Sequence, residues 1–286
     1  MITAPSAAAT AAESYLRARH DLTPGLQSEG AELLLAADGR SSYRIMADTV
    51  AGARRVLDLG CADGWLLERL AEAGAETLAG IDLSEGELAF ARRRPALAGA
   101  DLRCGRAQQL PYADGSYDAV VSHMAFMLMS DVEQVVAEVA RVLVPGGMFA
   151  VAVGGGAVKG EARDLFMTLA RPLFRARSTE SQVPELGDRR TRRREGLDEI
   201  LVPHGFEPVS WEPVAVDRRG TPEQVWEMLA GMLYDMHDLG EEQVAQLHDR
   251  FMTDSQSLVA PDGILPCGMW INHATTRLRS AQQIHA

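Results

Sequence analysis

A glycine-rich stretch that follows a short apolar run is the part of the sequence best suited to contact a ligand through its backbone. The stretch reads Asp58-Leu59-Gly60-Cys61-Ala62-Asp63-Gly64. Glycine lets the chain turn sharply and approach a ligand closely, and free N–H groups at the start of the next helix suit an anionic group. Asp82 ends the next apolar run, 18 residues after Gly64. Because a carboxylate at that place can accept hydrogen bonds from both hydroxyls of a ribose, the spacing predicts a nucleoside ligand.

The spacing of the loop disfavours a pyrophosphate dinucleotide as that ligand. Such sites use the pattern G-x-G-x-x-G, whereas this loop is G-x-A-x-G with its last glycine one residue early. Asp58, next to the loop, would also repel a pyrophosphate. The same carboxylate would hold an ammonium group or offset a cationic ligand. A nicotinamide-dependent dehydrogenase is therefore a distant alternative.

The elements that must position these residues alternate between strand and helix from about residue 54 to 153. Apolar runs predict strands over 54–59, 77–81, 101–104, 117–122 and 148–153. A helix is expected over 65–73, with Asp63 as its cap. Two more helices are expected to begin at capping boxes, one formed by Ser84 and Glu87 and the other by Ser130 and Glu133. Strands separated by helices predict a parallel sheet that is covered on both faces.

The flanking segments are largely helical. Residues 8–51 predict two or three helices, and 159–175 another. Residues 178–194 read as a loop that leads into a helix ending near 204–205, followed by a strand over 206–216. Thr221 and Pro222 predict a helix start, a second helix covers 241–259, and the last strand covers 264–275. The helical pair over about 221–260 is the candidate lid of the ligand site.

Composition excludes several classes of protein. The 286 residues carry a net charge of −12, which argues against coating of nucleic acid because that requires a basic surface. The hydrophobic fraction of 47% supplies a sizeable core, and no apolar run is long enough to span a bilayer. We expect no signal peptide, disulfide framework, metal site or membrane partner, and a soluble cytoplasmic protein. The sequence does not predict the oligomeric state.

Five stretches, in this order, resemble the motifs of the class I S-adenosylmethionine-dependent methyltransferases, in particular their small-molecule branch. The first is the glycine loop, which resembles D-x-G-x-G-x-G. The others are Ile81-Asp82-Leu83-Ser84, Gly105-Arg106-Ala107-Gln108-Gln109-Leu110-Pro111-Tyr112, Ser116-Tyr117-Asp118-Ala119-Val120-Val121-Ser122 and Arg141-Val142-Leu143-Val144-Pro145-Gly146-Gly147.

The resemblance implies an α/β, Rossmann-like fold: a seven-stranded mixed sheet with helices on both faces. It places an N-terminal helical cover at 1–50 and a methyltransferase domain at 51–286, with the helical lid inserted before the last strand. The implied cofactor is S-adenosyl-L-methionine, with S-adenosyl-L-homocysteine as product. The implied cofactor-binding residues are Asp58, Gly60, Cys61, Ala62, Gly64, Asp82, Leu83, Ala107, Gln108, His123 and Tyr15.

Two residues depart from the family pattern. Ala62 replaces the middle glycine, which a methyl group tolerates where the backbone has a negative φ. Arg106 stands where the family usually has an acid near the adenine amino group, and a cation cannot accept that hydrogen bond. We therefore expect the Ala107 backbone and the Gln108 side chain to recognise adenine.

His123, at the end of the fourth predicted strand, is the candidate catalytic residue. A histidine titrates near neutrality and can act as a general base or orient the acceptor; the alternative is a structural histidine that contacts cofactor through its backbone. Phe126 and Met127 belong to an apolar run that forms either a substrate wall or helix core. The predicted substrate-binding residues are Phe126, Met127, Trp226, Tyr234 and His237.

The predicted function is methyl transfer from S-adenosylmethionine to an oxygen or nitrogen of a small molecule. The methionine-rich predicted cover suggests a partly hydrophobic acceptor, and the composition together with the resemblance suggests a specialised metabolite. The alternatives are an RNA or protein methyltransferase and a non-catalytic cofactor-binding module. The basic patch Arg189–Arg194 has no interleaved aromatic residue for base stacking. We interpret it as an exposed helix start and expect no nucleic-acid partner.

Overall fold

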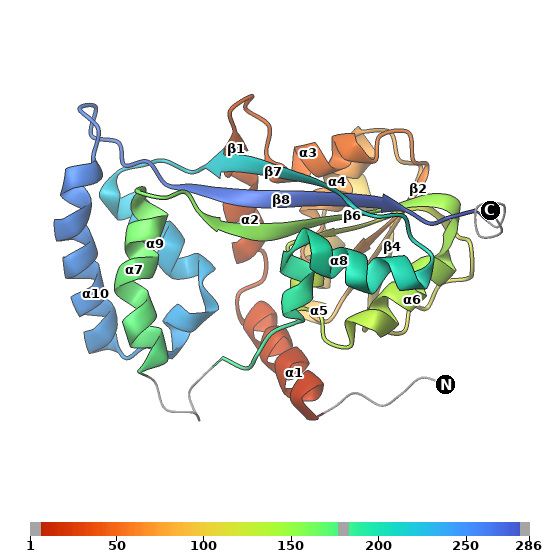
Figure 1. Ribbon diagram of the computed structural model, residues 1–286, viewed down its shortest axis with the longest axis horizontal. Helices are drawn as coiled ribbons and strands as arrows, with labels where there is room; N and C mark the ends of the chain where they lie inside the picture. Colours follow the sequence, from red (N-terminus) through yellow and green to blue (C-terminus); the bar gives the residue numbers. More distant parts are fainter. Residues whose placement is uncertain (1–6, 177–182, 281–286) are drawn as a thin grey trace.

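A computed structural model describes residues 7–176 and 183–280 of the chain. Its centre is an eight-stranded sheet in the order β1-β7-β8-β6-β5-β2-β3-β4 (Figure 1). The strands are β1 (Leu35–Ala36), β2 (Arg55–Leu59), β3 (Thr77–Asp82), β4 (Asp101–Cys104), β5 (Tyr117–His123), β6 (Leu143–Ala157), β7 (Ser210–Asp217) and β8 (Gly268–Arg277). The predicted mixed sheet is confirmed, with the two-residue β1 as an eighth strand.

The five strands from β2 to β6 run parallel to one another. Beyond β6, each of β8, β7 and β1 pairs antiparallel with the strand before it in the sheet order. Asp58 of β2 pairs in register with Gly80 of β3 and Val121 of β5. The carboxyl ends of the three strands therefore meet at one edge of the sheet, where ligands of open α/β sheets bind.

Helices cover both faces of the sheet (Figure 1). The N-terminal helices are α1 (Ala7–Leu22), α2 (Leu26–Glu32) and α3 (Ser42–Thr49). The crossover helices are α4 (Trp65–Glu72), α5 (Glu85–Ala91) and α6 (Val132–Val142), and α7 (Ala162–Arg175), α8 (Arg194–Leu201), α9 (Pro222–Met232) and α10 (Glu241–Asp254) follow.

The predicted helix starts are partly correct. Ser84 accepts a hydrogen bond from the Glu87 N–H and caps α5, and Thr221 with Gln224 forms a complete capping box at α9. The box at Ser130 was wrong, because Asp131 precedes α6 with a φ of 50° and makes no side-chain cap. A capping serine needs an extended backbone at the cap position. Here the residue at that position, Asp131, has a left-handed backbone.

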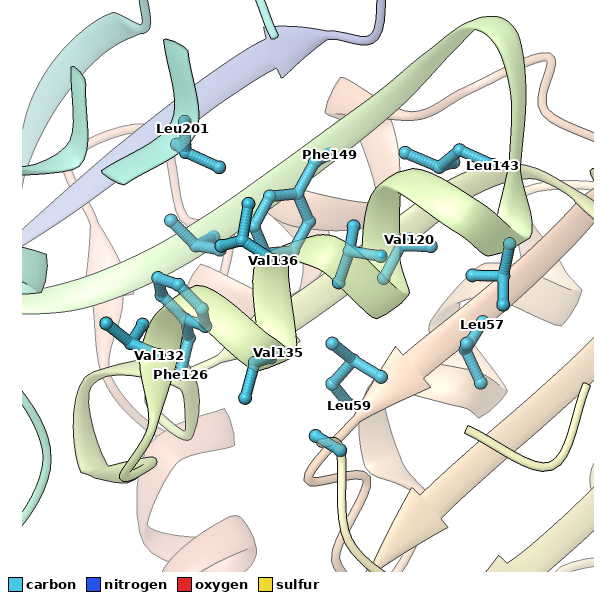
Figure 2. Packing of buried hydrophobic residues seen from close by; sticks show 14 of the residues in the cluster. Leu57, Leu59, Val120, Phe126, Val132, Val135, Val136, Leu143, Phe149 and Leu201 are labelled. Atoms are coloured by element: carbon cyan, nitrogen blue, oxygen red, sulfur yellow. The ribbon is translucent and has the colours of Figure 1, made fainter. Parts of the chain in front are cut away.

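Alternation along the central strands divides the core between the two faces. Leu57 and Leu59 of β2 pack with the valines of α6 and with Phe126 and Phe149 on one face (Figure 2). Val56 of β2 packs on the other face, against α3, α4 and α5. This is the two-residue period of a strand that is buried on both sides.

Helices α7, α9 and α10 form a further apolar cluster at one end of the sheet (Figure 1). Phe166, Trp226 and Phe251 make its centre, with ring centroids 5.5 to 5.8 Å apart. The helices expected over 221–260 therefore have a core of their own. In the part of the chain that the structure describes, no helix is long and apolar enough to cross a membrane.

We expect Phe149→Ala to lower the free energy of unfolding by about 3 to 5 kcal/mol, because removing a buried ring leaves a cavity. Phe149 is 1% exposed and lies 5.4 Å from Phe126 between ring centroids. Denaturant unfolding measures the change. The matched control is Phe90→Ala, since Phe90 is 42% exposed, and an equal loss in both variants would contradict this packing.

Candidate functional site

A cavity opens at the carboxyl ends of β2, β3 and β5 and has an empty volume of about 1370 Å³, including space open to solvent. Most of the predicted cofactor-binding residues line it. They are Asp58, Gly60, Cys61, Ala62, Asp82, Leu83, Ala107, Gln108 and His123. Gly64 and Tyr15 do not belong to the lining.

Asp58 presents an unpaired carboxylate oxygen in this cavity. The residue is 2% exposed, and its Oδ1 is buried without a hydrogen-bond partner among the residues the structure describes. Burial, and secondly the charge of Asp82, raise the pKa of Asp58 well above its usual range. An uncompensated buried carboxylate is costly, so the arrangement fits a ligand that brings an ammonium or other cationic group.

Asp82 fastens the glycine loop to the end of β3. Its Oδ2 accepts a hydrogen bond from the Ala62 N–H at 2.9 Å, and its Oδ1 accepts one from the Ser84 N–H at 2.9 Å. Burial raises the pKa of Asp82, although both hydrogen bonds oppose that shift. Each oxygen keeps a second lone pair, so the carboxylate can still accept ribose hydroxyls.

Ala62 does not have the negative φ that the sequence analysis required. Its φ is 45°, in the left-handed region, where an L-residue costs about 1 to 2 kcal/mol. The hydrogen bond from its N–H to Asp82 holds this conformation. The loop therefore keeps a glycine-like backbone without the glycine.

The two remaining glycines of the loop are required by close packing. Gly60 has a φ of 72°, and a Cβ there would collide with Cβ of Ala125. Gly64 has a φ of 85°, and a Cβ there would lie 2.5 Å from Leu97 Cδ1. Gly60 thus shapes the cavity directly, whereas Gly64 sets the entry into α4.

Asp63 is not the cap of α4, contrary to prediction. Gly64 takes the cap position without a side-chain hydrogen bond, because its left-handed backbone turns the chain directly into the helix. Asp63 is 3% exposed and pairs with Arg94 at 2.7 Å. Burial nevertheless raises its pKa.

The residues near the expected adenine end are tied to α1 and to the segment before α6. Arg106 makes two hydrogen bonds to Glu13 of α1, at 2.7 and 2.8 Å, which accounts for the cation in this position. The Gln108 side chain donates to the Ser130 carbonyl at 2.6 Å. Its amide nitrogen is therefore already engaged in holding the wall of the cavity.

Helix α1 covers the cavity with Glu13, Leu16, Arg17 and His20. His20 lies between Glu87 and Tyr234: its Nδ1 is 2.9 Å from Glu87 Oε1 and its Nε2 is 3.0 Å from the Tyr234 hydroxyl. Glu87 is fully buried and also accepts from the Gly25 N–H. Burial lowers the pKa of His20, but the Glu87 hydrogen bond and nearby acidic charges outweigh burial and raise it.

His123 lines the cavity with its imidazole held from two sides. Its Nε2 lies 2.7 Å from Ser42 Oγ, and its ring centroid lies 4.2 Å from that of Tyr43. Burial, together with the charge of His273, lowers the pKa of His123 to about 3. The ring is therefore neutral near pH 7 and is a poor proton acceptor.

The predicted substrate residues are spread over different environments. Tyr234 lines the cavity. Phe126 and Met127 pack in the core beside α6, Trp226 packs in the cluster of α7, α9 and α10, and His237 is exposed outside the cavity. Helical spacing alone does not distinguish a side chain that faces a ligand from one that faces a neighbouring helix.

Sequence reasoning identified only some of the residues that line the apolar part of the cavity. They are Leu34, Tyr43, Met124, Met232, Met269 and Ile271. Met124 belongs to the same apolar run as Phe126 and Met127, and Met232 belongs to the predicted helix that begins at Pro222. No local sequence pattern marked the other four residues. They come from separate elements that only the tertiary structure brings together.

Comparisons with known proteins relate the central part of this chain to methyltransferases. Residues 57–151 match a family model described as a methyltransferase domain. Over 112 residues the chain is 41% identical to a malonyl-[acyl-carrier protein] O-methyltransferase from Methylococcus capsulatus, covering 38% of this chain and 40% of that enzyme. Over 145 residues it is 35% identical to a demethylmenaquinone methyltransferase from Thermus thermophilus, covering 48% of this chain and 62% of that enzyme. The chain thus spans less than two thirds of these curated relatives.

A solved structure with the same fold covers nearly the whole chain. The crystal structure of the [4+2]-cyclase SpnF aligns with 98% of this chain and 99% of its own, with a TM-score of 0.58 and 23% identity. The likeness shows the fold alone. The family match falls on the segment from β2 to β6, which supplies Asp58, Asp82 and His123.

We expect Ala62→Gly to raise the free energy of unfolding by about 0.5 to 1 kcal/mol. Glycine removes the left-handed strain of roughly 1 to 2 kcal/mol and adds a smaller entropic cost, about 0.4 to 1 kcal/mol, through the unfolded chain. Urea unfolding measures the change. Ala71→Gly in α4 is the control and should destabilise; a loss in both variants would show that the strain at Ala62 is absent.

We expect the His20 pair to make stability depend on pH. Because the folded pKa of His20 is raised above 6.5, its contribution is complete below pH 6.5 and is lost as pH rises through the folded pKa. His20→Gln should therefore cost more stability at pH 6 than at pH 8.5 in urea unfolding. His248→Gln, at a partly exposed histidine of α10, is the control, and an equal cost of His20→Gln at both pH values would refute the assignment.

Proposed function

We propose that this chain, which carries a class I S-adenosylmethionine-dependent methyltransferase domain, methylates an oxygen or nitrogen of a partly apolar specialised metabolite. The observation that carries the proposal is one cavity with two unlike halves. One half holds the unpaired Asp58 carboxylate and Asp82. The other half, as we define it, consists of the apolar lining residues, and His123 lines the same cavity.

The residues of the first half fit S-adenosylmethionine. Asp58 Oδ1 would accept from the ammonium of the methionine part, and Asp82 from the ribose hydroxyls. Leu83 and Ala107 would pack against adenine, and the backbone at Cys61 and Ala62 would approach the ligand closely. When bound, the cofactor supplies a methyl group that its sulfonium already activates for in-line displacement.

The protein then contributes alignment and exclusion of water. Helices α1 and α2 cover the cofactor half with Leu16, His20 and Ala31. Neutral His123 is fixed by Ser42 and Tyr43, so it serves to orient the acceptor. Its lowered pKa argues against a general base.

The acceptor half supports a partly apolar small molecule. Its lining of methionine, leucine and isoleucine adapts to irregular apolar ligands. By name, relatives that this chain matches include O-methyltransferases of malonyl-[acyl-carrier protein] and of fatty acids, which supports an oxygen acceptor. The cover by α1 and the net charge of −12 argue against RNA as substrate.

Calorimetric titration with S-adenosylhomocysteine tests the cofactor assignment. We expect micromolar binding, and Asp82→Ala should weaken it by roughly 10- to 100-fold, since a hydrogen bond to a charged group contributes about 1.5 to 3 kcal/mol. Asp101→Ala on the exposed end of β4 is the matched control, and NADH is the control ligand. Tighter binding of NADH, or no binding by a folded wild-type protein, would end the proposal.

A further inference from the structure

Ser42 stands between two histidines that come from distant parts of the chain. Its Oγ lies 2.7 Å from His123 Nε2 on β5 and 3.5 Å from His273 Nε2 on β8. Ser42 is fully buried in the first turn of α3, and His123 and His273 are 8% and 5% exposed. The three side chains are therefore largely buried, and the hydrogen bonds among them decide where their protons lie, while His123 also lines the cavity.

The distances indicate where the hydroxyl proton of Ser42 goes. A serine hydroxyl has one proton to donate, and each neutral imidazole has one protonated nitrogen. A separation of 2.7 Å lies in the middle of the range of bonds donated by O–H, about 2.5 to 3.0 Å, and at the short limit of bonds donated by N–H, about 2.7 to 3.2 Å. The distances therefore favour donation by the Ser42 hydroxyl to His123 Nε2. In that arrangement His273 Nε2, 3.5 Å away, is the nitrogen that carries a proton and faces the Ser42 oxygen.

We propose that Ser42 is a positioning residue that holds His123 in the tautomer with its proton on Nδ1, so that His123 donates a hydrogen bond to an acceptor oxygen that is already anionic. This inference rests on the proposed function. His123 lines the cavity and its Nε2 is engaged by Ser42, so Nδ1 is the ring nitrogen left to bind a ligand. A protonated Nδ1 cannot remove a proton from an alcohol.

The same geometry selects a carboxylate over an amine. A neutral amine has one lone pair, which would have to serve both the His123 hydrogen bond and the attack on the methyl carbon. A carboxylate has several acceptor positions, so one binds Nδ1–H while another attacks. The new O–C bond forms as the C–S bond breaks, and the electron pair of that bond neutralises the sulfonium. No proton is released, so no base is required.

The groups around His123 keep it neutral over the working range of pH. Tyr43 on α3 and His273 on β8 lie against it, and Asp58 on β2 lines the same cavity. Burial raises the pKa values of Tyr43 and Asp58, and burial with the charge of Arg40 lowers that of His273 to about 4. For an acid acceptor, kcat/KM should therefore be constant between about pH 6 and 8.5.

Nitrogen NMR of the ¹⁵N-histidine-labelled full chain, saturated with S-adenosylhomocysteine, reads the tautomer directly. The shifts separate protonated from unprotonated ring nitrogens, and His123→Asn identifies the signals. We expect protonated Nδ1 in the wild type and a mixture of tautomers in Ser42→Ala. Ser255→Ala, another fully buried serine, is the control and should leave His123 unchanged. A proton on Nε2 in the wild type would overturn the proposal.

Two isosteric variants test the donor. Asparagine can place an N–H near the position of Nδ1, whereas aspartate offers only a charged acceptor. With decanoic acid, 1-decanol and decylamine as probe acceptors, we expect methyl ester from the acid to exceed the other products. His123→Asp should lose about 10- to 100-fold in kcat/KM for the acid relative to His123→Asn, as expected for one hydrogen bond to a charged group.

Larger turnover with the alcohol or amine, or equal activity of the two variants, would overturn the proposal. Thermal melting and S-adenosylhomocysteine binding are measured for every variant to exclude misfolding. Failure of the proposed function would appear as absent binding in the wild type, whereas failure of this inference leaves binding intact and changes the tautomer or the acceptor preference.

Discussion

The bond between the Asp82 carboxylate and the Ala62 N–H is the constraint on which the ligand cavity depends. It joins the loop after β2 to the end of β3 and holds a non-glycine residue at a positive φ. The second oxygen of Asp82 holds the entry to α5 through the Ser84 N–H. One partly buried side chain thus fixes two loops that come from different strands, and the cavity takes its shape between them.

The cofactor half could be predicted from the sequence because its determinants are local. The loop, Asp82 and the strand ends lie next to one another along the chain, and parallel pairing brings their carboxyl ends to one edge. The two incorrect predictions of helix caps also have a local cause. The caps at Asp63 and Ser130 were wrong because Gly64 and Asp131 enter their helices with left-handed backbones, and a residue pattern does not show φ.

The acceptor half could not be predicted for the opposite reason. Leu34, Tyr43, Met232 and Ile271 lie far apart in sequence and meet only because the antiparallel strands and the N-terminal helices close on the sheet. Phe126 and Trp226 illustrate the same difficulty, since each lies on an apolar face that packs against another element. Helical periodicity predicts that a face is buried but does not identify what covers it.

One half of the cavity is built from residues that are close in sequence and the other from residues of separate elements, so the two halves tolerate substitution differently. The cofactor half rests on backbone conformation and two carboxylates, so most substitutions there disturb the loop itself. The acceptor half rests on interchangeable apolar side chains, each from a separate element. Substitution of one methionine or isoleucine reshapes that half without moving Asp58 or Asp82. A protein of this architecture can therefore change the shape of one half of its cavity in small steps while the two carboxylates of the other half stay in place.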